Sequence, residues 1–582
     1  MIDAQTARPR SRRLRRSATL LVALVTTGGL TAGPAFASPA APDAAQQTAG
    51  VHVPKDRMAA LAAMQPSWNL GNTLDAIPDE TSWGNPLATK ALFDKIRSEG
   101  FRSVRIPVTW YPHESATAPY TIDATYLKRV KQVVDLAQAA GLYAEMNVHH
   151  DSWQWISNIA TDHDNVMARF NSTWQQIATA LKDEPRSLLM ESVNEPSFAN
   201  GTTDAQKKQY MNELNTSFFT IVRKSGGNNK NRLLVLPTQG CTPSDELMND
   251  LSATINSLHD PNLVATVHYY SYWPFSVNIA GTTTYDATTQ KDLNDAFARM
   301  RTIFTSKGVP VYLGEYGLLS EPNSGTVENG EMLKYYEELG YQARTSHVTS
   351  ALWDDANFLN RSSLQWREPD LMAMIKQSWT SRSGTAASDN LFLPKSGPIT
   401  DQTIDLNLNG TRFLTVWNGN AQLRDGPDYK VKDGKLTLFA SALTRLAGDR
   451  SYGVNSTVEL WFSEGVDWKL HIISSDLPVL SDATGTTDGL SVPTQYRGDQ
   501  LATIESKYTD GTNAGPASWT AFQGWGSSFA PDYAGNATTF TKEFLSSLTD
   551  GRTAVLTLHY RSGATGTYKL TRSGSTVTGS AS

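Results

Sequence analysis

Two glutamates in this 582-residue chain each end an apolar run of the length of a buried strand. Glu195 ends the stretch 188–195, which is cut off by Pro196, and Glu315 ends the run 311–315. Either glutamate alone would as readily be a salt-bridge partner. Two carboxylates that each end a strand, however, are the groups needed to hydrolyse a glycosidic bond. We therefore predict Glu195 as general acid/base and Glu315 as nucleophile.

Residues at the ends of other apolar runs could complete such a site. A nucleophilic carboxylate must stay ionised, so it needs cationic or donor neighbours. Arg105 could supply charge and Tyr270 a hydroxyl, although a surface ion pair and core packing are their ordinary roles. Asn194 directly precedes Glu195, and its amide could hold a sugar hydroxyl. Trp353 could form the floor on which a sugar ring stacks.

Three histidines also follow apolar runs, His149 and His150 after one run and His268 after another. With Asp151 they could form a metal cluster. Zinc sites, however, usually show histidines at helical spacing, and adjacent residues on a strand point apart. We favour a network that orients the two glutamates and the bound sugar, and we expect no metal and no cofactor. Purely structural histidines are the third possibility.

The chain has fifteen tryptophans, which is a high count. Large cores and sugar-stacking faces explain such a count equally well. Trp153 and Trp155 follow one predicted strand closely, and Trp273 follows another. Each alone would be packing at the rim, but together they predict a groove that binds several sugar units.

Eight strand-like runs alternate with helical patterns in the first part of the chain, and glycines such as Gly100 and Gly141 end the helices. The predicted strands are 68–71, 103–107, 143–149, 188–194, 232–237, 263–269, 311–315 and 351–353. Eight such units predict an α/β fold of the (β/α)8 TIM-barrel type, with the polar residues at the strand ends on one face. An open doubly wound sheet is the alternative, but it would not explain eight evenly spaced units.

The pattern changes after the linker-like segment 381–388, where short alternating strands and turns begin. We predict a TIM barrel over 54–382, followed by two all-β sandwich domains at 389–481 and 489–582.

The N-terminus reads as a secretory signal peptide, residues 1–37, followed by a disordered leader, 38–53. Six arginines without an acid precede an apolar run and the cleavage pattern Ala35-Phe36-Ala37. We therefore expect a secreted, extracellular protein that does not span a membrane, although the export route is not readable.

The whole chain carries a net charge of −6, and removing 1–37 makes it more acidic, which argues against nucleic acid as a partner. We expect a monomer. The single cysteine, Cys241, is expected to be inert.

Together these stretches resemble glycoside hydrolase family 5, in the cellulase clan. The stretch 188–197 fits the family's active-site signature. The other matching stretches, in family order, are 68–76, His149-His150, His268-Tyr269-Tyr270, 314–317 and Leu352-Trp353. The opening motif is similar to a subfamily of endo-β-1,4-glucanases that often also cut xyloglucan, mixed-linkage glucan or mannan.

The resemblance implies a retaining mechanism, with carboxyls about 5 Å apart. It implies supporting roles for Arg105, His149, Asn194, His268, Tyr270 and Trp353, and contacts between the sugar and Asn72 and His150. The function expected is a secreted endo-β-1,4-glucanase acting on cellulose and related β-glucans. A xyloglucanase or β-mannanase of the same fold is the alternative, and the preferred polysaccharide cannot be read from the sequence.

The last two domains resemble the immunoglobulin-like module of bacterial cellulases and a family-46 carbohydrate-binding module. In such three-module enzymes the last module can pack against the catalytic cleft, which makes Trp519 and Trp525 candidates for sugar stacking. Sandwich core is at least as good an explanation for one of them.

Two functions from other classes compete with this expectation. A non-catalytic glucan-binding protein would be favoured by the loss of either glutamate, and both are present. A metal-dependent hydrolase built on the histidines would lose its activity to a chelator.

Overall fold

The computed structural model describes residues 51–581. The predicted signal peptide and most of the predicted leader lie outside the described residues. Val51 and Val53 pack on the apolar cluster at one end of the barrel, and the Tyr143 hydroxyl donates to the His52 carbonyl at 2.7 Å. Residues 51–53 therefore belong to the first domain, and not to a disordered leader as predicted. No helix of residues 51–581 is long and apolar enough to cross a membrane.

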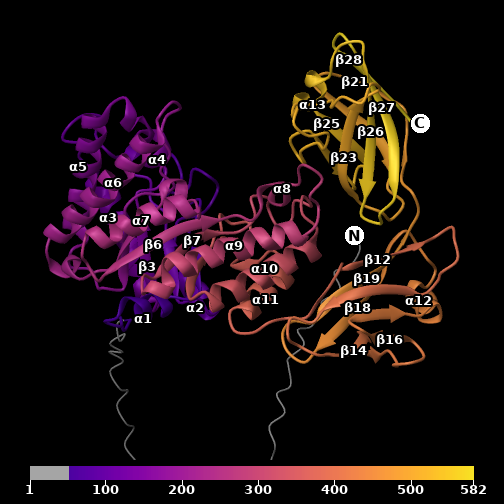
Figure 1. Ribbon diagram of the computed structural model, residues 1–582, viewed down its shortest axis with the longest axis horizontal. Coiled ribbons are helices and arrows are strands. Elements are labelled where there is room, and N and C mark those ends of the chain that lie inside the picture. Colours follow the sequence, from indigo (N-terminus) through magenta and orange to yellow (C-terminus); the bar gives the residue numbers. More distant parts are fainter. Residues whose placement is uncertain (1–50, 582) are drawn as a thin grey trace, which may run out of the picture. The chain divides into compact units, whose positions relative to one another are not determined.

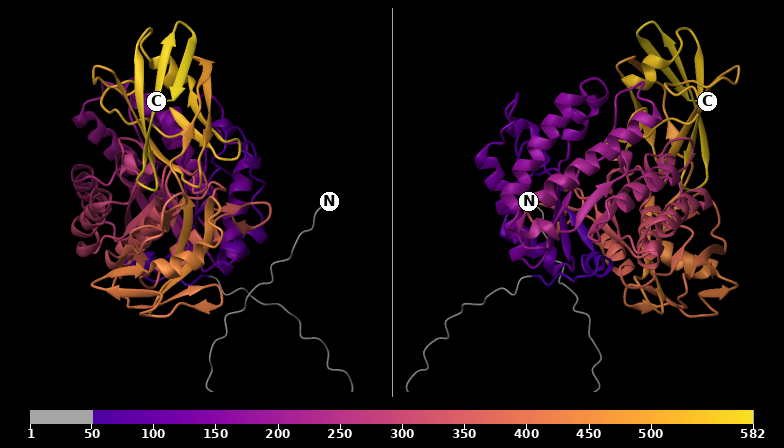
Figure 2. Two further views of the ribbon diagram at one scale, coloured as in Figure 1. Left: turned by 90° about the vertical axis from the view of Figure 1, so that its right-hand side faces the viewer. Right: turned by 60° about the vertical axis from the view of Figure 1, so that its left-hand side comes forward.

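The first domain is a closed barrel of eight parallel strands, as predicted, with helices on its outside (Figures 1 and 2). The strands are β1 (Ser67–Asn69), β2 (Ser103–Ile106), β3 (Tyr143–Asn147), β4 (Leu188–Glu191), β5 (Leu234–Pro237), β6 (Leu263–Tyr269), β7 (Val311–Tyr316) and β8 (Val348–Leu352). Strand β1 pairs with both β2 and β8, which closes the sheet. This closure excludes the doubly wound alternative.

Helices follow the strands and bury one face each. In α3, Val130, Val133, Val134 and Ala137 are buried at the 3–4-residue spacing of a helix face, and the Asp123 carboxylate caps the first turn. The helices of the barrel domain are α1 (Arg57–Ala62), α2 (Lys90–Ser98), α3 (Ala124–Ala139), α4 (Asp151–Gln154), α5 (His163–Leu181), α6 (Asp204–Lys224), α7 (Asp245–Ser257), α8 (Trp273–Ser276), α9 (Ala287–Ile303), α10 (Asn329–Thr345) and α11 (Pro369–Ser378). A short hairpin, β9 (Leu359–Asn360) and β10 (Gln365–Trp366), precedes α11.

The register of the barrel is interrupted where the site lies. The pairing of β6 with β7 shifts between Val267 and His268, and that of β7 with β8 shifts between Leu313 and Tyr316. Such irregularities re-aim side chains at the end of a strand. Here they turn the side chains of His268 and Glu315 toward the same point.

The second domain packs two sheets, with strand orders β11-β13-β17-β16 and β12-β19-β18-β14-β15. Its elements are β11 (Thr385–Ala386), β12 (Asn390–Pro394), β13 (Gln402–Asn407), β14 (Phe413–Asn418), β15 (Ala421–Gln422), β16 (Tyr429–Lys432), β17 (Lys435–Leu438), α12 (Ala440–Ala447), β18 (Gly453–Phe462) and β19 (Trp468–Ser475). The segment 381–388 is not a free linker, because Arg382 pairs with Glu337 and Glu338 at 2.7 Å and β11 joins the sheet.

The third domain is also all-β, apart from one short helix. Its elements are β20 (Val479–Leu480), β21 (Ala483–Thr486), β22 (Gly489–Gln495), β23 (Leu501–Tyr508), β24 (Phe529–Asp532), β25 (Ala537–Thr541), α13 (Lys542–Ser547), β26 (Thr553–Tyr560), β27 (Thr565–Ser573) and β28 (Thr576–Ala581). Strands β20 and β21 pair with β22 and β28, so this domain begins before the predicted residue 489.

A buried carboxyl at the start of the second domain makes the stability of the protein depend on pH. Burial, together with the nearby Glu328, raises the pKa of Asp389 from 3.8 to about 7. The folded protein therefore holds a proton there that the unfolded chain has released, and stability is lost as pH rises from about 4 to about 7.

Asp389→Asn carries no charge to bury and should remove this loss. At pH 8 we expect its melting temperature to exceed that of the wild type by roughly 4–8 °C, the shift that about 1 kcal/mol produces in a domain of 60–100 residues. At pH 4 the two proteins should melt together. Calorimetry at both pH values, with the exposed Asp79→Asn as control, measures the effect. An equal difference at both pH values would contradict the prediction.

Candidate active site

Strand β7 brings Glu315 into the centre of the barrel mouth, where its side chain is almost fully buried. The Tyr270 hydroxyl donates to Glu315 Oε2 at 2.6 Å, and Arg105 Nη1 donates to Oε1 at 2.7 Å. Burial acts to raise the pKa of Glu315, but His268 and Arg105 outweigh it, so the pKa is lowered. Glu315 is therefore held as a carboxylate.

Arg105, on β2, is fully buried among three carboxyl groups. Besides Glu315 it contacts Glu191 at 2.9 Å and Glu145 at 3.3 Å. Burial acts to lower the pKa of Arg105, but these carboxyls raise it well above its ordinary value. Burial and the charge of Glu191 raise the pKa of Glu145 well above its usual range, so Glu145 holds its proton. Arg105 is thus one cation shared among three carboxyl groups.

Glu195 lies beyond the end of β4 in a left-handed backbone conformation, φ 39°. This conformation lets Asn194 and Glu195 both face the barrel mouth, although neighbours on a strand would point apart. Arg105 Nη2 donates to Asn194 Oδ1 at 2.7 Å, which leaves the Asn194 amide nitrogen to donate to a sugar. The Glu195 side chain is 44% exposed, so it is open to solvent and substrate.

His268 lies between the two glutamates. Its Nδ1 is 2.7 Å from Glu195 Oε1 and 3.5 Å from Glu315 Oε2. Burial acts to lower the pKa of His268, but Cys241, Glu315 and Glu195 raise it well above its ordinary value. One oxygen of Glu195 and one of Glu315 lie within 4.8 Å of each other and of His268 Nδ1.

The side chains of His149 and Trp353 form one wall of the site, with ring centroids 6.0 Å apart and an angle of 3° between the rings. Burial lowers the pKa of His149 well below its ordinary value, so this ring is neutral. Gly71 is needed beside Trp353, because a Cβ there would lie 3.0 Å from the indole. Asn72 follows Gly71 and is half-buried.

His150 contacts the ring of His149, and three of the predicted tryptophans lie on the segments that follow β3 and β6. The ring centroids of His150 and Trp153 are 4.9 Å apart. The side chain of Trp153 is 56% exposed and that of Trp273 is 49% exposed. Both indoles are available to sugars. Trp155 is not: it is buried, it donates to Asp151, and Arg169 covers its ring at 4.5 Å. The prediction of Trp155 as a sugar-binding residue is therefore wrong, since the turn of α4 points it inward.

The two tryptophans predicted in the third domain have different surroundings. Trp519 is 61% exposed, and its ring centroid lies 6.2 Å from that of Trp273. Trp525 packs on Phe529, and its amide donates to the Asn278 carbonyl at 3.3 Å, so it joins the third domain to the barrel domain. Trp519 is therefore the more open of the two, whereas Trp525 is half-buried.

Sequence reasoning missed several residues that the barrel brings to the site. Glu145 lies inside β3 and Glu191 is the last residue of β4, within the longer run predicted as a strand, and their inward orientation follows only from barrel closure. Trp83 lies exposed in the loop after β1, 5.4 Å from His150, and no strand end marks it in the sequence. Cys241 reaches His268 from the turn after β5.

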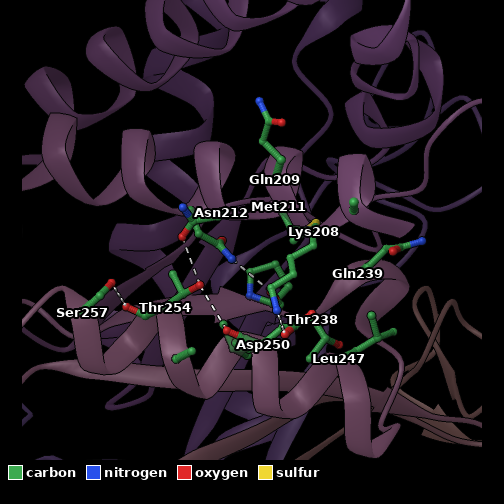
Figure 3. Close-up of a pocket in the computed structure, with 15 residues that line it drawn as sticks. Lys208, Gln209, Met211, Asn212, Thr238, Gln239, Leu247, Asp250, Thr254 and Ser257 are labelled. Atoms are coloured by element: carbon green, nitrogen blue, oxygen red, sulfur yellow. Dashed lines mark hydrogen bonds and ion pairs between the residues drawn. The ribbon is translucent and has the colours of Figure 1, made fainter. Parts of the chain in front are cut away.

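A separate cavity of about 430 Å³ lies between α6 and α7 (Figure 3). Its polar side chains satisfy one another: Lys208 pairs with Asp250, and Thr254 donates to Asn212 at 3.1 Å. Neither Glu195 nor Glu315 lines this cavity. The groups that can carry a reaction are Glu195 and Glu315 at the barrel mouth.

The site can perform acid–base and nucleophilic chemistry at one point. It offers a buried carboxylate with a lowered pKa, a second carboxyl open to solvent, and donors on either side. Within residues 51–581, three clusters of histidine, cysteine and acidic residues have ligand atoms within 4.8 Å of one another, and two of these clusters include His268. The raised pKa of His268 keeps both ring nitrogens protonated, which disfavours the role of a metal ligand.

Comparison with known families divides the chain into three parts. Residues 70–357 match the family described as cellulase (glycosyl hydrolase family 5). Residues 386–472 match carbohydrate binding domain X2, and residues 476–580 match the carbohydrate binding domain CBM46.

Relatives match over nearly the whole chain. Endoglucanase B of Paenibacillus lautus is 44% identical over 575 residues, which cover 98% of this chain and 100% of that protein. The solved full-length tri-modular endo-β-1,4-glucanase B (Cel5B) from Bacillus halodurans has a TM-score of 0.88 and 40% identity, covering 90% of this chain and 99% of that one. A tri-modular endo-β-1,4-glucanase from Bacillus licheniformis, solved with cellotetraose, has a TM-score of 0.76 and 30% identity, covering 88% and 99%.

Proposed function

The chain belongs to glycosyl hydrolase family 5, so it is a glycoside hydrolase, and we propose that it is a secreted, retaining endo-β-1,4-glucanase. Its substrates would be cellulose and related β-glucans, cut at internal bonds. The observation that carries the proposal is the pair Glu195 and Glu315, whose carboxyl oxygens lie within 4.8 Å of each other. Retaining enzymes place their carboxyls about 5–5.5 Å apart, whereas inverting enzymes need about 6.5–9.5 Å to admit a water molecule.

In the first step, Glu315 Oε attacks the anomeric carbon while Glu195 gives its proton to the departing glycosidic oxygen. The bond to the leaving sugar breaks, and an ester bond to Glu315 forms. Arg105 and Tyr270 hold Glu315 in place and ionised. The free amide nitrogen of Asn194 is positioned to donate to a hydroxyl of the reacting sugar.

In the second step, water attacks the same carbon. Glu195, now a carboxylate, takes the proton from that water, and Glu315 leaves as a carboxylate, so the enzyme returns to its starting state. The exposure of Glu195 supports this role, because water must reach it once the leaving sugar has gone. Two inversions at one carbon retain its configuration.

The aromatic surfaces support an extended sugar chain as substrate. Trp353 forms a flat wall beside the glutamates, while Trp153 and Trp273 are exposed on the segments that follow β3 and β6. The relatives named as endo-β-1,4-glucanases favour a β-1,4-glucan. A xyloglucanase or β-mannanase is the alternative, and another matched structure of this family is titled a xyloglucan-specific endo-β-1,4-glucanase.

Initial rates of reducing-sugar release on carboxymethyl cellulose, xyloglucan and β-mannan test the proposal. We expect cleavage of at least one β-glucan, with the fastest substrate naming the specificity, and no loss of activity with EDTA. Loss of activity with EDTA would favour the metal-dependent hydrolase. If none of the three polymers is cut but the protein binds them, the non-catalytic binding function takes its place.

Trp519 is expected to contribute to the binding of long chains. Trp519→Ala removes one exposed ring beside Trp273 and should raise KM on polysaccharide by about 2–10-fold, which corresponds to the roughly 0.5–1.5 kcal/mol of one aromatic contact. Cleavage of a short aryl cello-oligosaccharide should not change. Trp461→Ala, which removes a partly exposed indole from the second domain, is the matched control. An unchanged KM on polymers, or an equal effect of the control, would refute the role of Trp519.

A further inference from the structure

The turn after β5, residues 239–241, has an unusual backbone for its sequence. Gly240 and Cys241 both lie in the left-handed region, with φ of 57° and 50°. Glycine adopts this conformation freely, but for a cysteine it is unfavourable. The turn is held by a hydrogen bond from Gly240 N to Pro196 O, at 2.8 Å. It is therefore tied to the residue that follows Glu195.

This backbone buries the Cys241 side chain completely and directs it toward the site. The thiol sulfur, a nitrogen of His268 and a carboxylate oxygen of Glu191 lie within 4.8 Å of one another. Burial raises the pKa of the Cys241 thiol, although His268 opposes this, so the thiol stays protonated. The sulfur is thus a neutral, polarisable neighbour of the imidazole.

Apart from the thiol, two contacts fix the orientation of the His268 ring. Nδ1 is engaged by Glu195, but Nε2 is buried and has no hydrogen-bond partner among residues 51–581. On another side, Gly314 lies so close that a Cβ there would be 3.0 Å from Nε2. The ring is thus set between the thiol and the β7 backbone, in a space that fits one orientation.

We propose that Cys241 is a positioning residue, whose thiol holds the imidazole of His268 with Nδ1 toward Glu195 and Glu315. The inference rests on the proposed function only for its kinetic consequence. Cys241 would then act on the reaction through His268, without touching the substrate.

The consequence for pH dependence follows from the groups around His268. Besides Glu195 and Glu315, the charged and titratable groups that act on it or on its partners are Glu191, Glu145, Arg105, His149 and Tyr270. Protonated His268 helps to lower the pKa of Glu315. Without the thiol the charged ring is no longer held with Nδ1 toward Glu315, so it should stabilise the Glu315 carboxylate less. The pKa of Glu315 should then rise, and the acidic limb of kcat/KM should move to higher pH.

The test compares Cys241→Ala and Cys241→Ser with wild type in kcat and KM across the pH range, on a soluble β-glucan. For Cys241→Ala we expect the acidic limb to move up by about 0.5 pH unit, with kcat falling roughly 3-fold on that limb and KM nearly unchanged. Cys241→Ser should return the acidic limb most of the way to its wild-type position, because its hydroxyl can take the place of the thiol. Thr242→Ala, in the same turn but exposed, should match the wild type.

A second readout does not depend on activity. The titration of the His268 ring, followed by NMR with His268→Gln for assignment, should show a lower pKa in Cys241→Ala than in the wild type. This result stands even if no polysaccharide is cut, so failure of the proposed function is distinguishable. An unchanged His268 titration, or a pH profile of Cys241→Ala that is scaled down without a shift, would overturn the proposal. If Cys241→Ala does not fold, the test rests on Cys241→Ser. The proposal then requires Cys241→Ser to show the His268 titration and the pH profile of the wild type. A pH profile of Cys241→Ser shifted as far as that of His268→Gln would overturn it.

Discussion

Glu315→Gln should lower kcat on β-glucan by about 10⁴-fold or more, the scale of loss seen when the nucleophile of a covalent mechanism is removed. Glutamine is close to glutamate in size. Its one amide oxygen can still accept from Arg105, while the Tyr270 hydroxyl can turn to accept from the amide NH2, so the fold should persist. Its amide oxygen, however, cannot form the glycosyl ester. Initial rates on the fastest polysaccharide, together with melting temperatures, separate loss of chemistry from loss of structure.

The control is Glu246→Gln, which changes an exposed glutamate on α7 and should retain full activity. A 2-deoxy-2-fluoro glycoside with a good leaving group adds a direct test, since it should trap the sugar on Glu315 of the wild type. Peptide mass spectrometry would locate the label. Full activity of Glu315→Gln, or a label on another residue, would remove Glu315 as nucleophile.

The pH range of the wild type should reflect the same electrostatics. Burial alone would raise the pKa of Glu315 and leave much of it protonated in mild acid. His268 and Arg105 outweigh burial, so the pKa is lowered and the nucleophile stays ionised below the ordinary carboxyl value of 4.5.

The strand ends of the barrel could be predicted because an apolar run followed by a polar residue can be recognised in the amino-acid sequence alone. Glu195 and Glu315 both stand out in this way. Glu145 and Glu191 do not, because a charged residue within a strand carries no mark of which face it occupies. Only closure of the barrel brings both of them to Arg105.

Residues on short helices and turns were harder to place. Trp153 and Trp155 are two positions apart in the sequence, and both follow β3 closely. The single turn of α4 exposes the first and buries the second against Arg169. The contact of Cys241 with His268 depends on a left-handed turn that a cysteine rarely adopts, so nothing in the sequence predicts it. The partner of Trp519 lies in another domain, which a linear pattern cannot reveal.

Glu195→Gln should lower kcat/KM most for substrates whose leaving group needs a proton. On polysaccharide we expect kcat/KM to fall by about 10²–10⁴-fold, the usual contribution of general acid–base catalysis. On an aryl cellobioside with an acidic phenol, the first step needs no proton and should be nearly as fast as in wild type. The second step still lacks its base, so a burst of phenol followed by slow turnover is expected.

Azide should rescue this slow step in Glu195→Ala, because the exposed position of Glu195 leaves room for a small anion. An anion needs no general base, so it attacks the glycosyl ester directly and should give a β-glycosyl azide, with configuration retained. In Glu315→Ala the same anion can only replace the nucleophile, and the product should be the α-glycosyl azide. The two products therefore assign the two roles independently of rate. A β-azide from Glu315→Ala, or an α-azide from Glu195→Ala, would reverse the assignment.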